Sequence, residues 1–403
     1  MESHTFLIQL VLILFSARVV GEFAARLQIP SVIGELLAGI LIGPSLLGIV
    51  EATPSIQLLA QIGIILLLFE VGLDTDIGKL LKAGLKAFAV AVFGVAMPFA
   101  LGFALSYYVF HCSGLCSFFI GSTLTATSIG ITLRVLSDLK KQSTPEAQII
   151  LGAAVLDDII GIVLLSLLYE FSSSGEVNLW NAGKVMVFII IFFITAPIAA
   201  KIISAAIRRW DAQSDIPGLL PTMIVSLILL FAWLAHKLGA PELLGGFAAG
   251  LALSRQFLLP FAKFLNDPEE FTQKVHKGMQ PIIHLFTPIF FVTIGLSLNL
   301  REINWGSPYI WTLTGSLLVV AALTKLAAGL SLIKESRFSK LIIGMAMVPR
   351  GEVGLIFAEV GLKSGILNNE VYASLILVIA ITTLVAPFGL RWLYAKEETR
   401  LKS

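Results

Sequence analysis

The sequence predicts an all-α polytopic membrane protein of about thirteen transmembrane helices, built as an inverted repeat with two crossed discontinuous helices. The first supporting observation is composition: 57% of the 403 residues are hydrophobic and 13% are charged, whereas an ordinary soluble domain carries about 25% charged residues. A soluble fold of this length could not bury so much apolar surface, but a bilayer could. The other two observations are alternating basic loops and a matched pair of interrupted apolar segments.

Apolar runs separated by charged, Gly-rich or Pro-rich breaks define the spans, because a helix needs about 20 mostly apolar residues to cross the hydrocarbon core. The spans lie near residues 5–25, 30–50, 56–73, 84–110, 115–136, 146–169, 180–206, 217–237, 240–256, 278–299, 308–333, 340–362 and 370–393. The first run is expected to be a true span, since Met1–His4 lacks Lys and Arg and no small-residue cleavage site follows. We therefore expect one transmembrane domain without a soluble regulatory domain: repeat 1 at 5–169, a linker helix at 180–206 and repeat 2 at 217–393.

Basic residues orient this bundle, because they gather in the loops on one side and are scarce on the other. The rich loops hold Arg26, Lys79, Lys82, Lys86, Arg134, Lys140, Lys141, Lys201, Arg208, Arg209, Arg255, Lys263, Lys274, Lys277, Lys334, Arg337, Lys340, Arg391, Lys396, Arg400 and Lys402; the poor loops hold Lys237, Arg301 and Lys363. The positive-inside rule then places the N-terminus outside and the C-terminus in the cytoplasm. The expected location is the inner (plasma) membrane.

The fifth and twelfth spans are both interrupted at mid-membrane depth. The fifth carries the polar stretch Gly121–Gly130, and the twelfth carries Gly344–Gly354 with Pro349 inside it. Proline removes a backbone donor and glycine favours unwinding, so both spans should be discontinuous helices. Corresponding spans seven apart run in opposite directions, which indicates an inverted repeat and points to an ion site between the two breaks.

Two adjacent carboxylates, Asp157 and Asp158, lie halfway through the sixth span. Each costs about 2.5–3.5 kcal/mol at a helix centre, so a partner or a use is expected. Neighbouring residues point about 100° apart on a helix, so one Asp can face another helix while its neighbour faces a cavity. A buried ion pair without a transport role is the alternative.

Lys325 lies inside the eleventh span on a face of small residues. Its long stem would allow the ammonium to snorkel to the cytoplasmic end. The alternative, which we favour, is a buried ammonium paired with Asp157, because a buried lysine beside carboxylates can release and regain a proton.

Other polar groups surround the two breaks. Arg350 and Glu352 are two residues apart, so they could pair locally or cap half-helix ends, and a purely structural role fits equally well. Hydroxyl and freed carbonyl oxygens could bind a hard cation, or simply reflect the polarity of a helix break. These oxygens belong to Thr125, Thr127 and Ser128.

The sequence assigns no chemical role to several polar residues. They are Glu70, His236, His276 and His284, all near span ends. The two cysteines, Cys112 and Cys116, have a spacing that could suit a metal or a disulfide, but two small residues at a helix end is the simpler interpretation.

Taken together, these segments resemble the monovalent cation:proton antiporter-2 family of the cation/proton antiporter superfamily over essentially the whole chain. The resemblance is carried by Phe69–Asp74, Thr125–Ser128, Ala154–Ile159, Lys325 and Pro349–Gly354. It implies a thirteen-helix homodimer in which a core domain (spans four to six and eleven to thirteen) moves like an elevator against a scaffold (spans one to three and eight to ten). It also implies that Asp158 binds the ion while Asp157 pairs with Lys325. Potassium-efflux relatives usually have Gln before the Asp and a cytosolic nucleotide-binding domain; Asp157 at that place favours the bacterial sodium/proton exchangers.

The sequence thus predicts a secondary antiporter that exchanges Na+ for protons, with Asp158 and Asp157 as Na+ ligands and no cofactor beyond the transported ions. Alternatives are Li+ or K+ as the cation, a K+ efflux system, and an organic-anion symporter or a channel on the same scaffold. An enzyme is not expected, because an intramembrane aspartyl protease needs facing carboxylates from two helices. The formal net charge of +2 gives no electrostatic basis for nucleic-acid binding.

Overall fold

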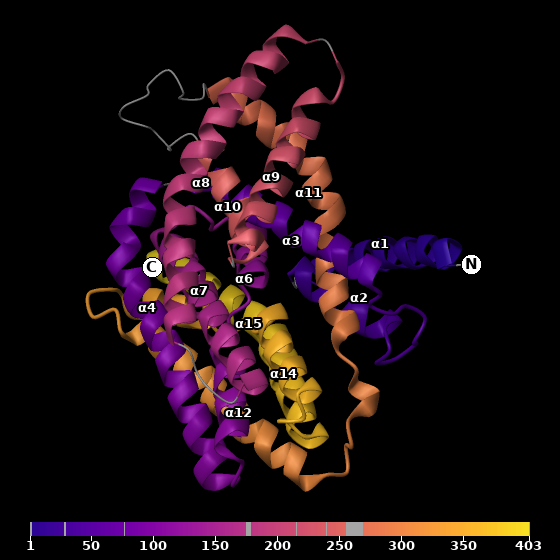
Figure 1. Cartoon of the computed structure of the whole chain (residues 1–403), viewed down its shortest axis with the longest axis vertical. Helices are drawn as coiled ribbons and strands as arrows, with labels where there is room; N and C mark the ends of the chain where they lie inside the picture. The colour runs from indigo at the N-terminus through magenta and orange to yellow at the C-terminus, as the bar shows by residue number, and fades with distance from the viewer. Residues whose placement is uncertain are drawn as a thin grey trace. The chain divides into compact units, whose positions relative to one another are not determined.

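A computed structural model describes residues 2–27, 30–75, 77–174, 179–214, 216–238, 240–254 and 269–402. All the regular secondary structure in these residues is helical. The helices in chain order (Figure 1) are α1 (Glu2–Arg26), α2 (Ser31–Ile42), α3 (Pro54–Asp74), α4 (Ile77–Ala104), the π-helix η1 (Leu105–Val109), α5 (Gly114–Thr125), α6 (Ile129–Asp138), α7 (Pro145–Ser174), α8 (Leu179–Gln213), α9 (Leu219–Lys237), α10 (Glu242–Leu253), α11 (Glu269–Ser297), the 3-10 helix η3 (Leu300–Glu302), α12 (Pro308–Leu330), α13 (Arg337–Ala346), α14 (Glu352–Lys363) and α15 (Asn369–Lys402).

The predicted helical membrane fold is confirmed within these residues. Each of the thirteen predicted spans overlaps one α-helix, except that the fifth is the pair α5 and α6 and the twelfth is the pair α13 and α14. Eight described segments are long and apolar enough to cross a membrane, and three shorter apolar helices accompany them. The two predicted interruptions are therefore the places where a continuous span becomes two half-helices.

Several helices extend beyond their predicted spans. The helix α4 begins at Ile77, α11 begins at Glu269, and α8 continues to Gln213. The added turns carry Lys, Glu, Gln and Arg, which are good helix formers and end an apolar run without ending a helix. By contrast, α2 ends at Ile42, eight residues before the predicted boundary.

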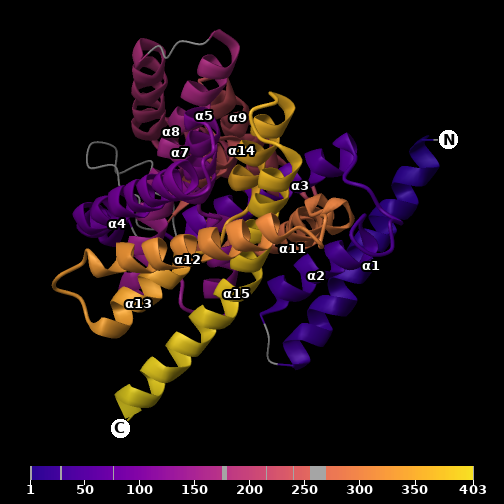
Figure 2. The ribbon, with the colours of Figure 1, turned by 90° about the horizontal axis from the view of Figure 1, so that it is seen from below.

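The chain forms two compact units. Unit 1 comprises Met1–Ala52, Ala83–Asn178 and Val292–Ser403, and unit 2 comprises Thr53–Lys82 and Leu179–Phe291. Unit 1 contains both interrupted helices, and within it α12 packs against α13 and α15 (Figure 2). Unit 2 contains α3, α8, α9, α10 and most of α11. These two units are defined by which residues pack together. The division into two repeats, and that into a scaffold and a core domain, remain predictions.

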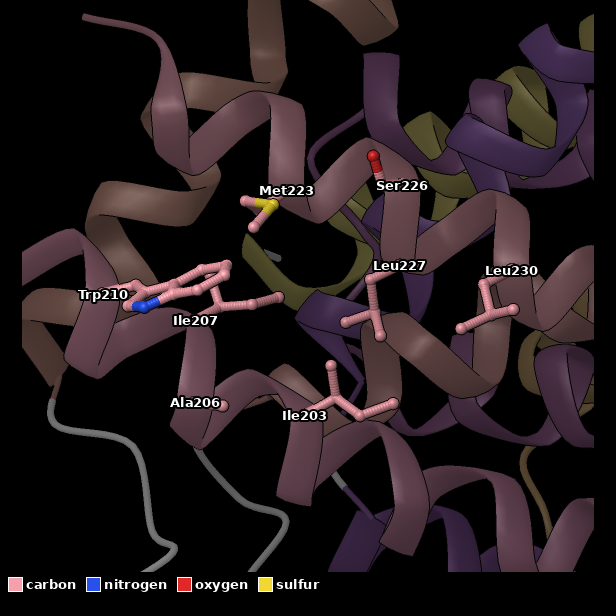
Figure 3. Close-up of a pocket in the computed structure, with 8 residues that line it drawn as sticks. All are labelled: Ile203, Ala206, Ile207, Trp210, Met223, Ser226, Leu227 and Leu230. Carbon is pink, nitrogen blue, oxygen red and sulfur yellow. The ribbon is translucent and has the colours of Figure 1, made fainter. Parts of the chain in front are cut away.

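Unit 2 carries an apolar groove between α8 and α9 (Figure 3). Its volume is about 310 Å³, and its lining consists of Ile203, Ala206, Ile207, Trp210, Met223, Ser226, Leu227 and Leu230. Trp210 is 62% exposed and Leu230 is 42% exposed. Such an exposed apolar surface is typical of a face that meets lipid chains.

Glycines allow the closest helix contacts in both units. In unit 2, Gly72 of α3 and Gly250 of α10 face each other's backbones, and in unit 1 Gly39 of α2 faces Gly295 of α11. A methyl group at any of these glycines would overlap a backbone carbonyl of the opposite helix. Small residues at such crossings let helices approach closely where the surrounding lipid gives no hydrophobic drive.

We expect Gly329→Ala to destabilise the protein by about 1–3 kcal/mol, as overpacking does elsewhere. Gly329 lies on α12 where a Cβ would overlap the Lys340 carbonyl and lie 2.8 Å from the Gly344 nitrogen of α13. Gly315→Ala on the same helix is the control, because no atom lies within 4 Å of its added Cβ. Thermal unfolding in detergent should show a lower Tm for the first variant only, and equal Tm values would contradict the close approach.

Candidate functional site

The first break separates α5 from α6. The helix α5 ends at Thr125, and Ala126 and Ser128 adopt extended backbone angles before α6 begins at Ile129. This stretch holds β-branched and hydroxyl residues, whose side chains compete with the helix for backbone hydrogen bonds. The break lies in the buried interior of unit 1, where non-helical backbone is tolerated because protein surrounds it.

The second break separates α13 from α14 and lies against the first. Pro349 cannot continue the hydrogen-bond ladder, and its carbonyl accepts a bond from the Ser128 N–H at 2.8 Å. A Cβ at Gly351 would lie 2.6 Å from Ser128 Oγ, so the close approach requires glycine there. The Thr127 hydroxyl donates to the Met347 carbonyl at 3.3 Å. The two interrupted helices therefore meet at their breaks, as the matched pair of interruptions predicts.

The titratable side chains predicted on the sixth and eleventh spans come together at this crossing. Lys325 Nζ lies 3.3 Å from Asp157 Oδ2 and donates to Thr127 Oγ1 at 2.8 Å. Lys325, Asp157 and Asp158 are all buried, at 0%, 3% and 6% exposure. Lys325 does not snorkel, since its ammonium lies at the crossing and not at a helix end. Asp157 Oδ1 accepts no hydrogen bond from the described residues.

Arg350 is fully buried and joins three helices through backbone carbonyls. Its guanidinium donates to the carbonyls of Val348 and Leu124, at 2.9 Å and 2.8 Å, and to that of Ala321 at 3.3 Å. Leu124 lies in the last turn of α5 and Val348 follows α13, so the cation lies at the negative ends of two half-helices. These contacts are those of the capping alternative for Arg350, and a local pair with Glu352 stays a prediction. The side chain of Glu352 lies outside the described residues, although α14 begins at that residue.

The hydroxyls near the first break differ in their contacts. Thr125 Oγ1 donates to the Ser122 carbonyl at 2.7 Å within its own helix. Thr127 links the Lys325 ammonium to the second break. The arrangement thus gathers carboxylate, hydroxyl and carbonyl oxygens around one buried ammonium, and oxygen ligands of this kind suit a hard cation.

Two threonines at the crossing were missed by sequence reasoning. The Thr132 hydroxyl donates to the Ala346 carbonyl at 2.6 Å, tying α6 to the end of α13. The Thr383 hydroxyl of α15 donates to the Arg350 carbonyl. The neighbouring Thr382 and Thr383 form a polar pair in an apolar span, which was the available signal, but threonine can also bond within its own helix.

The cysteines lie away from this crossing. Cys112 and Cys116 are free thiols, and Cys112 Sγ lies 3.7 Å from the Tyr309 hydroxyl. Hydrogen bonds from Cys116 and, more weakly, from Tyr309 lower the pKa of Cys112 to about 6. Neither the disulfide nor a metal cluster predicted as an alternative is present among the described residues. Glu70 is half-buried in α3 and remains without an assigned role.

Sequence comparison places the whole chain among cation/proton antiporters. A family model described as "Sodium/hydrogen exchanger, transmembrane" matches residues 11–396. The high-affinity Na+/H+ antiporter NhaS3 of Synechocystis is 32% identical, over 97% of this chain and 91% of the relative. The Na+/H+-K+ antiporter GerN of Bacillus cereus is 33% identical over 99% and 98%, and a Na+/H+ antiporter of Enterococcus hirae is 31% identical over 96% and 97%.

Structure comparison supports the same fold. The sodium proton antiporter MjNhaP1 from Methanocaldococcus jannaschii superposes with a TM-score of 0.70 over 96% of this chain and 95% of that chain. The two sequences are 21% identical. At this identity the likeness concerns the arrangement of helices and not the ion that is bound.

Proposed function

Because this chain belongs to the sodium/hydrogen exchanger family, we propose that it is a secondary antiporter that exchanges a monovalent cation, Na+, for protons across the membrane. The observation that carries the proposal is the buried cluster at the crossing of the interrupted helices. It gathers two carboxyl groups, of Asp157 and Asp158, and two cationic side chains, of Lys325 and Arg350, all of them buried. An uncompensated charge at such a depth costs several kcal/mol.

Exchange follows from this charge balance. When the Asp158 carboxyl group is protonated, a cation that enters the cluster adds one positive charge, so that proton must leave if the net buried charge is to stay the same. Asp158 is the proposed site of both, since a carboxylate can hold either a proton or a cation. Asp157 pairs with the Lys325 ammonium at 3.3 Å, and that ammonium also donates to the Thr127 hydroxyl at 2.8 Å.

Exchange of the cation and the proton across the membrane requires that the site open to each side in turn. We propose that this alternating access is an elevator-type movement of a core domain that carries the crossing. The protein is proposed to lie in the plasma membrane as a homodimer, with its N-terminus outside and its C-terminus in the cytoplasm. The alternation of basic loops supports this orientation. The hydrogen bonds between the two breaks support movement of both interrupted helices together.

K+ is the second candidate for the cation. The observation that favours it is the similarity to GerN, whose name includes both Na+ and K+. Carboxylate and hydroxyl oxygens do not by themselves distinguish these two ions, since selectivity depends on the size and rigidity of the site.

A cation panel in proteoliposomes tests the proposal. The purified protein is reconstituted with a pH-sensitive dye inside, a proton gradient is imposed, and Na+, Li+, K+ or choline is added outside. We expect Na+ to produce proton movement that empty liposomes and choline do not produce. Proton flux that is independent of every alkali cation would contradict antiport, and a larger response to K+ than to Na+ would favour the second candidate.

A further inference from the structure

The two cysteines lie together at the beginning of α5, in a part of unit 1 that the proposed exchange does not use. Cys112 stands two residues before the helix, and Cys116 lies in its first turn. Their side chains are hydrogen-bonded to each other, and both are free thiols in the structure. Two thiols in contact can be joined by a single two-electron oxidation.

The two sulfurs differ in their exposure. Cys116 is 7% exposed and belongs to a hydrophobic core cluster that includes Phe119 and Leu313. Cys112 is half-buried and packs against the rim of that cluster. A reagent dissolved in water therefore reaches Cys112, while the surrounding apolar side chains shield Cys116.

The surroundings of Cys112 favour its thiolate. Cys112 Sγ lies 3.7 Å from the Tyr309 hydroxyl, and both that hydroxyl and the Cys116 thiol can donate to a sulfur anion. Two more titratable groups, the exposed His111 and Glu370 on α15, adjoin these side chains. With the pKa of Cys112 at about 6, about nine tenths of this thiol is ionised at pH 7, against about 3% for an ordinary cysteine.

Backbone hydrogen bonds fix the position of both cysteines. The Cys112 N–H donates to the Ser106 carbonyl at 3.0 Å, which ties the residue to the preceding helix. The Cys116 N–H donates to Ser113 Oγ at 3.2 Å, so Ser113 caps α5 between the two thiols. The contact between the sulfurs is therefore held from both sides, as a reacting pair requires.

We propose that Cys112 and Cys116 form a redox-active pair that reacts with hydroperoxides, with Cys112 as the attacking thiolate and Cys116 as the resolving thiol. First, the Cys112 sulfur attacks the terminal peroxide oxygen and the O–O bond breaks. The sulfur is oxidised to a sulfenic acid, and the reduced peroxide takes a proton from water and leaves as an alcohol, or as water. The Cys116 sulfur then attacks the Cys112 sulfur, the S–O bond breaks, and a disulfide forms while the Cys116 proton leaves with the hydroxide as water.

The location of the pair agrees with this chemistry. In the proposed orientation the loop before α5 lies outside the cytoplasm, where disulfides persist. The reaction itself does not depend on that orientation.

Oxidation of the purified full-length protein in detergent tests the proposal. The protein is reduced, freed of reductant and treated with hydrogen peroxide at pH 7. We expect the intact mass to fall by two hydrogen atoms, peptide mapping to place the disulfide between Cys112 and Cys116, and dithiothreitol to reverse the change. Cys116→Ser should stop at the sulfenic acid, which dimedone labels at Cys112. In Cys112→Ser the remaining thiol should be oxidised at least about tenfold more slowly, because it is buried in apolar surroundings.

The pH dependence of alkylation by iodoacetamide provides a second measurement. The rate at Cys112 of the wild type should reach half its maximum near pH 6, and Tyr309→Phe should move this midpoint upwards because it removes a donor to the thiolate. Tyr108→Phe is the matched control, since Tyr108 is 70% exposed and lies outside the cluster. Its midpoint should equal that of the wild type.

Several results would overturn the proposal. They are two free thiols in the wild type after peroxide treatment, a disulfide between two chains instead of within one, faster oxidation of Cys112→Ser than of Cys116→Ser, and an alkylation midpoint near the ordinary thiol pKa of about 8.5. The first, second and fourth need no variant, so they hold even if a substitution disturbs folding. None of these outcomes depends on transport, so the thiol pair and the proposed exchange are tested separately.

Discussion

Replacing Asp158 by Asn is expected to abolish cation-dependent proton exchange while the protein still folds and inserts. Asp158 is 6% exposed and directly follows Asp157, whose carboxylate contacts Lys325 at the crossing of the two interrupted helices. An amide has nearly the same shape as a carboxyl group but cannot take up and release a proton at neutral pH, nor neutralise a bound cation. Proton flux from the variant in proteoliposomes should fall to the level of empty liposomes for every cation tested.

Asp138→Asn is the control for this loss. Asp138 lies at the end of α6, away from the break, and its Oδ1 is 3.4 Å from Arg134 Nε. The pair is partly exposed, so its removal should change stability by less than about 1 kcal/mol and leave exchange intact. Near-normal Na+-dependent flux in Asp158→Asn would remove Asp158 from the ion site, provided that size-exclusion profiles show both variants to be folded.

The second large effect is expected from the buried pair of Asp157 and Lys325. Lys325→Ala and Asp157→Ala should each lower the free energy of unfolding by about 3–5 kcal/mol, because each leaves the other charge buried without its partner. The double variant should lose less than the sum of the two, by roughly 0.5–3 kcal/mol. Unfolding by a graded denaturant, measured for the four proteins of this cycle, gives that difference directly.

Lys86 and Glu335 provide the comparison pair. Their charged atoms are closer, at 2.6 Å, but the side chains are 49% and 24% exposed. Water and salt screen such a pair, so its coupling should be below about 1 kcal/mol. If the cycle for Asp157 and Lys325 is additive, or no larger than that for Lys86 and Glu335, the buried contact does not contribute to stability as the geometry indicates.

The span count was accessible from the sequence because both of its determinants act locally. An apolar run either is or is not long enough to cross a bilayer, and basic residues in a short loop bias that loop towards one side of the membrane. The two interruptions were accessible for the same reason, since Pro349 and the polar stretch before Gly130 disfavour helix wherever they stand. Helix ends were harder to predict from the sequence. The helices α4, α8 and α11 extend beyond their apolar segments, because polar residues that favour helix flank those segments.

The sequence by itself also determined which residues would be costly inside a membrane, and hence that Asp157, Asp158 and Lys325 needed partners. The free-energy cost of burying a charged side chain in a membrane depends on the residue type and its depth, so it can be judged for each position separately. Which groups meet is decided only by packing. Arg350 takes its acceptors from Leu124 and Ala321, 226 and 29 residues away.

The contacts of Thr132 with the end of α13, and of Gly351 with Ser128, likewise exist only because two breaks with no common sequence pattern are brought within hydrogen-bond distance. No local preference of either segment specifies that meeting. It follows from the packing of α5, α7, α12, α14 and α15 around it, which leaves each buried polar group one set of acceptors.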